Sequence, residues 1–148
     1  MNTSYEPQIW KKQDTILVKL PYVDFDHNAS EHFKLMITSL IEKHDCYSLI
    51  LDFSTVMLVD GIGLAALISA FNACSAKDIK LLLCALKPSI VEVIKDKGID
   101  TMVEIFDNMH EALDDATNDS FLRQKRDNVS KSFEDVFGAS FEENIKYS

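Results

Sequence analysis

Apolar residues in the first hundred or so positions recur with two alternating spacings, one typical of strands and the other typical of helices. Segment 5–10 is expected to pair with the first strand as a hairpin, and Pro7 suits only an edge strand there. Short, mainly apolar runs predict strands over 15–20, 47–53, 79–85 and 102–106.

Helical patterns alternate with these strands. Asn28 and Glu31 have the spacing of a capping box and predict the start of the first helix. Pro88 fits the first turn of a third helix and Gly98 its C-terminal stop, and Asn108 again has a Glu three residues later. Helices are expected over 28–44, 61–76, 88–98 and 108–113, with a loop of apolar middle over 54–60. Strands alternating with helices predict an α/β fold, with a small, largely parallel sheet of four to five strands and about four helices.

The alternation stops around Asp114. The segment 115–128 is mostly polar and is expected to be a linker or a frayed helix. We therefore expect a domain over 1–116 and a C-terminal extension over 117–148 that is helical or partly disordered. Beyond the linker, Val129, Phe133, Val136 and Phe137 share one helical stripe. Two interpretations of this stripe stay open. It packs on the body of this chain or of a dimer mate, or it is a peptide that recruits a partner or covers the exposed side of the expected helix over 61–76, which includes Ile62.

Composition narrows the class of protein. The chain has 148 residues, of which 47% are hydrophobic and 26% charged, as in one ordinary globular domain. Its formal net charge of −9 disfavours nucleic acid or an anionic membrane as a main partner, and no apolar run predicts insertion into a membrane. Cys46, Cys74 and Cys84 are expected to be buried and reduced, as in a cytoplasmic protein.

The sequence carries no motif that argues for catalysis. The segment 60–63 follows a strand and opens a helix, but no Gly-Lys-Ser/Thr follows it, and Ala66 stands where a dinucleotide motif would have its third glycine. The four histidines lack the spacing of metal ligands, and no nucleophile motif is present. No catalytic residue, metal or cofactor is expected.

The expected helix over 61–76 contains no charged residue. At 100° per residue its larger residues are expected to pack on the sheet: Leu64, Leu67, Ile68, Phe71 and Ser75. The opposite, uncharged face is expected to be exposed and consists of Ile62, Ala65, Ala66, Ser69, Asn72 and Ala73. Such a face indicates a contact with a protein partner or with a second copy of the chain, unless the chain's own C-terminal segment covers it.

The same region resembles the signature of STAS domains, the family of sulfate transporters and anti-sigma factor antagonists. The residues over 51–64, Leu-Asp-Phe-Ser-Thr-Val-Met-Leu-Val-Asp-Gly-Ile-Gly-Leu, resemble a strand ending in Asp-Leu-Ser, an apolar loop, and Asp-Ser-Ser-Gly-Leu opening a helix. Further matches in register are Lys87-Pro88, Gly98-Ile99 and segment 106–113. The resemblance covers roughly 5–113 and implies a small mixed sheet packed with helices.

The resemblance also implies a function. Stand-alone members are typically anti-sigma factor antagonists, which bind an anti-sigma factor that is also a serine kinase. Phosphorylation two residues after the motif aspartate ends binding, and a phosphatase restores it. Carried over, Asp60 matches the aspartate, Gly63 the glycine and Leu64 the leucine, while the phosphoacceptor position holds Ile62 beside Gly61. Neither of the last two residues has a hydroxyl group.

We therefore expect a non-enzymatic, cytoplasmic regulatory module without the usual switch, its partner an anti-sigma factor, serine kinase or phosphatase. The expected partner-binding residues are Asp60, Gly61, Ile62, Gly63, Ala65, Ala66, Ser69, Asn72 and Ala73. The chain is either fixed in its binding form or switched at another hydroxyl, with Ser54, Thr55, Ser69 and Ser89 as candidates. The alternative is a soluble accessory subunit of a lipid or anion transporter, or a scaffold protomer, and a homodimer is compatible with each role.

Overall fold

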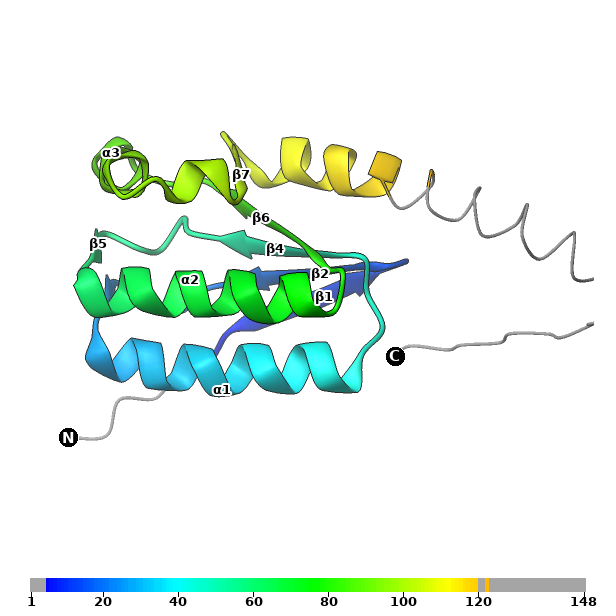
Figure 1. Ribbon diagram of the computed structural model, residues 1–148, viewed down its shortest axis with the longest axis horizontal. Coiled ribbons are helices and arrows are strands. Elements are labelled where there is room, and N and C mark those ends of the chain that lie inside the picture. Colours follow the sequence, from blue (N-terminus) through cyan, green and yellow to red (C-terminus); the bar gives the residue numbers. More distant parts are fainter. Residues whose placement is uncertain (1–4, 120–121, 123–148) are drawn as a thin grey trace, which may run out of the picture.

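A mixed five-stranded sheet forms the centre of the molecule in the computed structural model, which describes residues 5–119 and 122 (Figure 1). The strand order is β1-β2-β4-β6-β7; β1 is antiparallel to β2 and all the other pairs are parallel. The strands are β1 (Gln8–Lys12), β2 (Thr15–Lys19), β4 (Ser48–Asp52), β6 (Lys80–Cys84) and β7 (Glu104–Phe106). The predicted α/β fold and the hairpin are confirmed, but the edge strand is Gln8–Lys12 instead of the expected segment 5–10, and Pro7 lies just before it.

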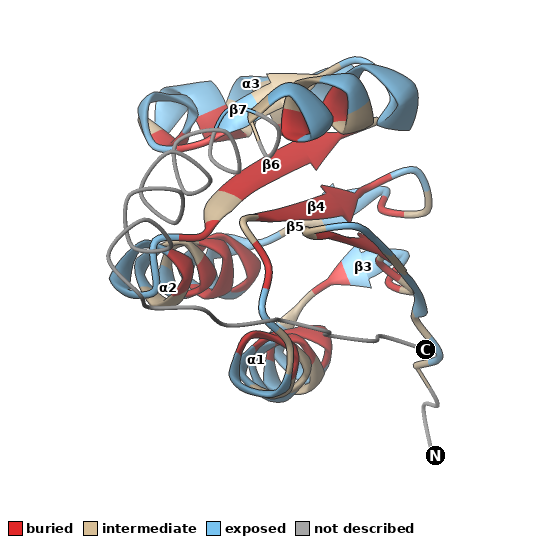
Figure 2. Ribbon diagram, turned by 90° about the vertical axis from the view of Figure 1, so that its right-hand side faces the viewer, coloured by how far each residue is buried: buried red, intermediate tan, exposed pale blue. Residues whose placement is uncertain are grey.

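Helices cover both faces of this sheet. Three of them, α1 (His27–Lys43), α2 (Gly61–Ala76) and α3 (Pro88–Asp96), contribute to the larger core (Figures 1 and 2). A fourth helix over 109–119 packs on the opposite face through Ala112 and Ala116, which are fully buried. The four expected helices are therefore present. Among the described residues, no helix is both long and apolar enough to cross a membrane.

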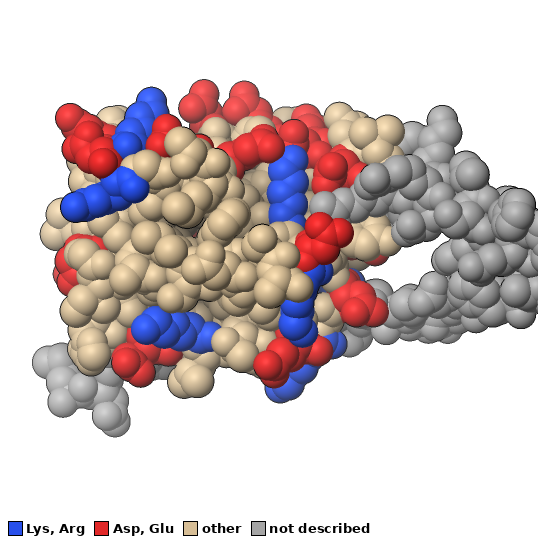
Figure 3. All heavy atoms as spheres, viewed as in Figure 1, with Lys and Arg blue, Asp and Glu red and all other residues tan. Residues whose placement is uncertain are grey.

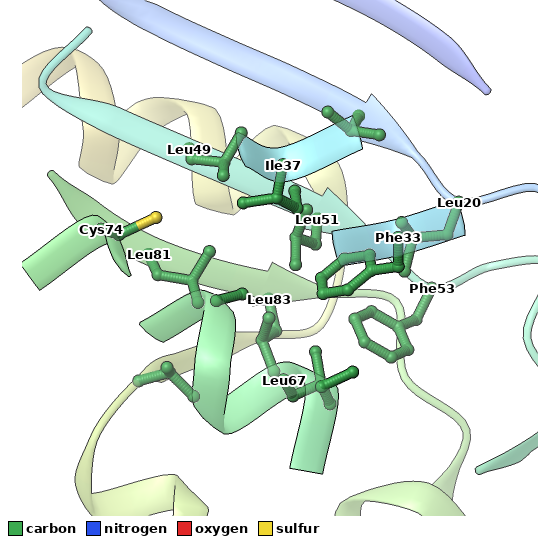
Figure 4. Close-up of a cluster of buried hydrophobic side chains, with 14 of the residues drawn as sticks. Leu20, Phe33, Ile37, Leu49, Leu51, Phe53, Leu67, Cys74, Leu81 and Leu83 are labelled. Atoms are coloured by element: carbon green, nitrogen blue, oxygen red, sulfur yellow. The ribbon is translucent and has the colours of Figure 1, made fainter. Parts of the chain in front are cut away.

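The central strand β4 shows why the sheet needs cover on both sides. All five of its residues are buried, because alternate side chains point to opposite faces and each face carries helices. Leu49 and Leu51 join the larger core, whereas Ile50 joins the smaller one beneath the helix over 109–119. Figure 4 shows the larger core, where side chains from strands β4 and β6 meet α1 and α2. Its labelled residues are Leu20, Phe33, Ile37, Leu49, Leu51, Phe53, Leu67, Cys74, Leu81 and Leu83.

Two helix starts test the capping predictions. The first helix begins at His27, not Asn28, because the Asp26 carboxylate is the cap and its Oδ1 accepts a hydrogen bond from the Ala29 amide at 3.1 Å. The predicted capping box of Asn28 is therefore wrong. By contrast, Asn108 Oδ1 accepts from the Glu111 amide at 2.9 Å, so that cap is confirmed.

The chain differs from expectation in three further places. A second, two-stranded sheet pairs β3 (Asp24–Phe25) with β5 (Leu58–Val59). Of these strands, β5 lies inside the segment 54–60 that was expected to be a loop. The last strand is shorter than predicted, since a 3₁₀ helix, η1 (Ile99–Thr101), precedes it. The helix over 109–119 continues past its expected end at 113 into the segment expected to be a linker or a frayed helix, because the fully buried Ala116 continues its apolar face. The stripe from Val129 to Phe137 lies outside the described residues.

Candidate functional site: the N-terminal end of α2

The start of α2 is held by the small β3–β5 sheet. The amide of Asp60 donates to the Phe25 carbonyl at 3.3 Å, and Asp60 Oδ1 accepts from the Gly63 amide at 2.8 Å. A Cβ atom on Gly63 would overlap the Phe25 carbonyl oxygen, so only glycine allows this close approach. Asp60 is thus the N-cap of α2, and Gly63 is what lets the helix start lie against β3.

Four large apolar side chains remain exposed around this helix start. Ile62 is 47% exposed, Met57 50%, Leu58 66% and Val23 55%. The Val23 carbonyl accepts hydrogen bonds from the amides of Met57 (2.7 Å) and Leu58 (3.2 Å), which places these three residues together, and Ile62 follows Leu58 by four positions at the start of α2. We call Val23, Met57, Leu58 and Ile62 the apolar patch. Exposed apolar residues grouped in this way are typical of a surface that contacts another molecule.

The exposed side of α2 extends the apolar patch without adding charge. Figure 3 shows the face formed by α2, where most of the surface belongs to neither acidic nor basic residues. Of the residues expected to bind a partner, six are exposed: Asp60, Gly61, Ile62, Ala65, Ser69 and Asn72. Ala73 is half-buried.

The predicted orientation of α2 needs a correction. Ala66 is fully buried and Gly63 is buried as well, whereas Ser75, expected to pack on the sheet, is exposed. The buried face consists of Gly63, Leu64, Ala66, Leu67, Ala70 and Cys74. Small residues dominate it because α2 packs against α1 as well as the sheet, and a close helix approach leaves no room for larger side chains. Gly63 and Ala66 therefore shape the site from beneath and do not form its surface.

Hydroxyl groups are available near the site but not at its centre. Ser54, Ser69 and Ser89 are exposed and Thr55 is half-buried. The Ser54 amide donates to Asp52 Oδ1 at 2.7 Å, and the Ser54 carbonyl accepts from Lys87 Nζ at 2.9 Å. These bonds fix the loop after β4 and hold an ammonium group beside Ser54.

The described residues offer no group of three or more potential metal ligands. The three cysteines are buried, and burial raises the pKa of Cys46 to about 11 and the pKa of Cys74 and Cys84 to about 12. At neutral pH these thiols are protonated and therefore weak nucleophiles. What the site presents is apolar surface, which suits binding.

The site lies in a part of the chain that resembles known proteins. A family model described as "STAS domain" matches residues 8–112, which include β1, the apolar patch, α2 and the start of the last helix. This chain belongs to the STAS domain family. The start of α2 at Asp60 to Leu64, where the STAS resemblance was strongest, is thus part of a STAS domain.

Relatives of this STAS domain include an anti-sigma F factor antagonist of Paenibacillus polymyxa, 20% identical over 90 residues, which are 61% of this chain and 77% of the relative. The crystal structure of an anti-sigma factor antagonist from Mycobacterium paratuberculosis superposes with a TM-score of 0.68 at 17% identity, over 77% of this chain and 95% of that one. A sulfate transporter family protein from Wolinella succinogenes gives a TM-score of 0.63 at 19% identity, over 72% and 87% of the chains. These structures share the fold.

Sequence reasoning missed three residues of the apolar patch. Ile62 was expected at the surface, but Val23, Met57 and Leu58 were not singled out. The available signal was the apolar middle of the loop over 54–60, which a solvated loop does not need. No sequence pattern placed Val23 beside that loop, because the β3–β5 pairing joins segments more than thirty residues apart.

Proposed function

We propose that this STAS domain is a non-enzymatic regulatory module of the anti-sigma factor antagonist type, which binds an anti-sigma factor of the serine kinase class. The observation that carries the proposal is Ile62, which is 47% exposed at the first turn of α2, among the exposed side chains of the apolar patch. The name of the Paenibacillus polymyxa relative supports the same role.

In this proposal Ile62 is an anchor instead of a switch. The family position that would carry a phosphoserine holds a side chain that cannot accept a phosphoryl group, so the usual route to release is closed. Burying a half-exposed isoleucine contributes about 1 kcal/mol, and the neighbouring patch residues add similar amounts. The domain therefore stays in its binding form unless another hydroxyl group, such as that of Ser54, takes over the switch.

A single charge at the anchor tests the proposal. In a pull-down from lysate of the source cell, followed by titration with the purified partner, we expect the intact chain to bind an anti-sigma factor with kinase homology. Ile62→Asp should weaken this binding at least about tenfold, because the carboxylate would lose its water in the interface. It should leave the free energy of unfolding within about 0.5 kcal/mol, as expected of an exposed position.

Leu35→Asp is the matched control. Leu35 is 74% exposed on α1, so its replacement adds the same charge outside the apolar patch and should not change affinity. Equal loss for both variants, or none for either, would refute the docking role of Ile62. Recovery of transporter subunits in place of a kinase would instead support an accessory subunit.

A further inference from the structure

A separate hollow lies at the other end of α2, away from the apolar patch. It has a volume of about 170 Å³ between the last turns of α2, the start of β6 and the chain leading into β7. Its walls include the apolar residues Phe71, Leu81 and Met102 and the polar residues Asp78, Lys80 and Glu104. Met102 is 42% exposed and Phe71 is half-buried, so apolar surface faces the hollow without being fully covered.

The size of the hollow selects its occupant. A protein cavity of about 150 Å³ accommodates one benzene ring, so this space suits a single phenyl group and is too small for a nucleotide. Phe71 offers a ring edge or face to such a group, and the Met102 sulfur is a favourable neighbour for an aromatic ring. The hollow therefore has the size for one aromatic side chain, with Phe71 and Met102 as its apolar contacts and Ser75, Asp78, Lys80 and Glu104 as polar residues in the wall.

The helix over 109–119 delivers the rest of the chain to the rim of this hollow. Lys80 Nζ contacts Glu104 Oε1 at 3.0 Å and Asp115 Oδ2 at 2.9 Å, so the rim and the last helix share one ammonium group. Burial lowers the pKa of Lys80, but its hydrogen bonds to Asp115 and Glu104 outweigh this and raise it, which keeps the bridge charged. Asp119 follows Asp115 by only about 6 Å of helix. The segment 120–132 spans about 20 Å as a helix and about twice that when extended, enough to return to the hollow.

The charges of the following segment complement the rim. Segment 123–131 contains four basic residues and one acidic residue. The lining of the hollow carries the carboxylates of Asp78 and Glu104 and the ammonium group of Lys80, which also contacts the carboxylate of Asp115 on the last helix. A basic segment held beside this acidic surface gains modestly from the attraction, and it brings the apolar residues that follow close to the hollow.

We propose that the C-terminal segment 129–137 of this same chain binds in the hollow and that the ring of Phe133 fills it. Phe133 is the central residue of the apolar stripe, with Val129 four positions before it and Phe137 four positions after it. On this assignment the segment 123–148 is an intramolecular ligand of the C-terminal end of α2. The N-terminal end, with the apolar patch, stays open to a partner.

Disulfide trapping in the full chain tests the assignment. Ser75→Cys places a thiol at an exposed position on the wall of the hollow, and Ser132→Cys places one next to Phe133. The control pair combines Ser132→Cys with Ser54→Cys, which is also exposed but follows the C-terminal end of β4, at the opposite end of the sheet from the start of β6. The native thiols are buried, so they compete poorly for the oxidant.

At low micromolar concentration under mild oxidation, the Ser75–Ser132 pair should form an intramolecular disulfide at least about tenfold faster than the control pair. Adding Phe133→Ser should reduce the rate of disulfide formation in the Ser75–Ser132 pair to that of the control pair. Adding Phe141→Ser, at a position outside the stripe, should leave this rate unchanged. Peptide mapping by mass spectrometry identifies the linked residues. Equal rates for the two pairs would overturn the proposal. Linkage only between two chains would also overturn it, since the occupant would then be a second copy.

Discussion

The helices α2 and 109–119 pack on opposite faces of the sheet, and their outer sides differ in charge. In α2 none of the sixteen residues is charged, yet five of its residues that were expected to bind a partner are exposed. The helix over 109–119 exposes charged residues, among them Glu111 and Asp114, and contacts the sheet through small buried alanines. Both helices satisfy the sheet, so packing does not explain the missing charge on α2. This difference is the one expected if the outer side of α2 makes the contact proposed above, while the outer side of the last helix faces solvent.

The largest expected effect concerns the anchoring of α2. Gly63→Ala should lower the free energy of unfolding by about 2–4 kcal/mol, because the added Cβ overlaps the backbone carbonyl of Phe25 and the two small strands must separate. Urea unfolding followed by circular dichroism measures this. Gly61→Ala is the control, since a Cβ there meets no atom within 4 Å, and it should be neutral or slightly stabilising. Equal effects at the two glycines would contradict the anchoring role.

A pair of alanines contrasts the inner and outer sides of the two helices. Ala112→Leu should destabilise the protein by about 1–3 kcal/mol, because Ala112 is fully buried against the sheet and the larger side chain overpacks that contact. Ala65→Leu, at an exposed position on α2, should leave stability unchanged within about 0.5 kcal/mol. Thermal unfolding measures the stability of both variants. A destabilised Ala65→Leu would show that the outer side of α2 is already covered.

A hydroxyl group introduced at position 62 tests the proposed function of the α2 surface. Ile62→Ser should become a substrate of the partner kinase in the presence of ATP, and the phosphorylated form should lose affinity through the charge placed within the apolar patch. Phosphate-affinity electrophoresis measures the modification, with the intact chain as the control that reveals phosphorylation elsewhere. An Ile62→Ser variant that binds the kinase but stays unmodified would show that the domain presents this position differently.

The smallest expected effect is a pH dependence on the α1 side. His32 Nδ1 lies 2.7 Å from the Tyr22 hydroxyl, and burial lowers the pKa of His32 below its ordinary value. Because the folded state prefers neutral imidazole, this contribution to stability is present above the unfolded pKa of about 6.5 and is lost as pH falls below it. His32→Gln should therefore flatten the stability profile as the pH falls below about 6.5. If urea unfolding at several pH values gives the same pH dependence of the free energy of unfolding for both proteins, His32 does not contribute to it.

Local signals were enough to predict most of the fold. Pro88 and Asn108 act on their own neighbours, so the helix starts that depend on them were correct, whereas α3 ends at Asp96, two residues before the expected end at Gly98. The error at the first helix had the same local character: Asp26 and Asn28 are both good caps, and only the backbone decides between them. The β3–β5 pair has strands of two residues, too short for any periodic pattern to appear.

The site was harder to predict because its members come from separate segments. Ile62 could be assigned to the surface from the motif, but Val23 joins it only through the pairing of β3 with β5. The rotation of α2 was misjudged because larger apolar side chains were expected to face the core. In this helix the small residues Gly63, Ala66, Ala70 and Cys74 take buried positions, Gly63 directly against the Phe25 carbonyl, and such close approaches between separate segments leave no periodic pattern in the sequence.

The parallel order of β2, β4 and β6 has a consequence for how the chain reaches its native state. Thr15 pairs with Ser48, and Ser48 pairs with Lys80, so each parallel contact joins residues more than thirty positions apart (15 to 48, and 48 to 80). Such a sheet cannot grow from a hairpin, and each pairing closes a long loop before it gains any contact energy. Folding should therefore be slower than that of a helical bundle of the same length. Until these pairings form, β4, which the folded protein buries on both faces, leaves apolar side chains exposed that can associate with other chains.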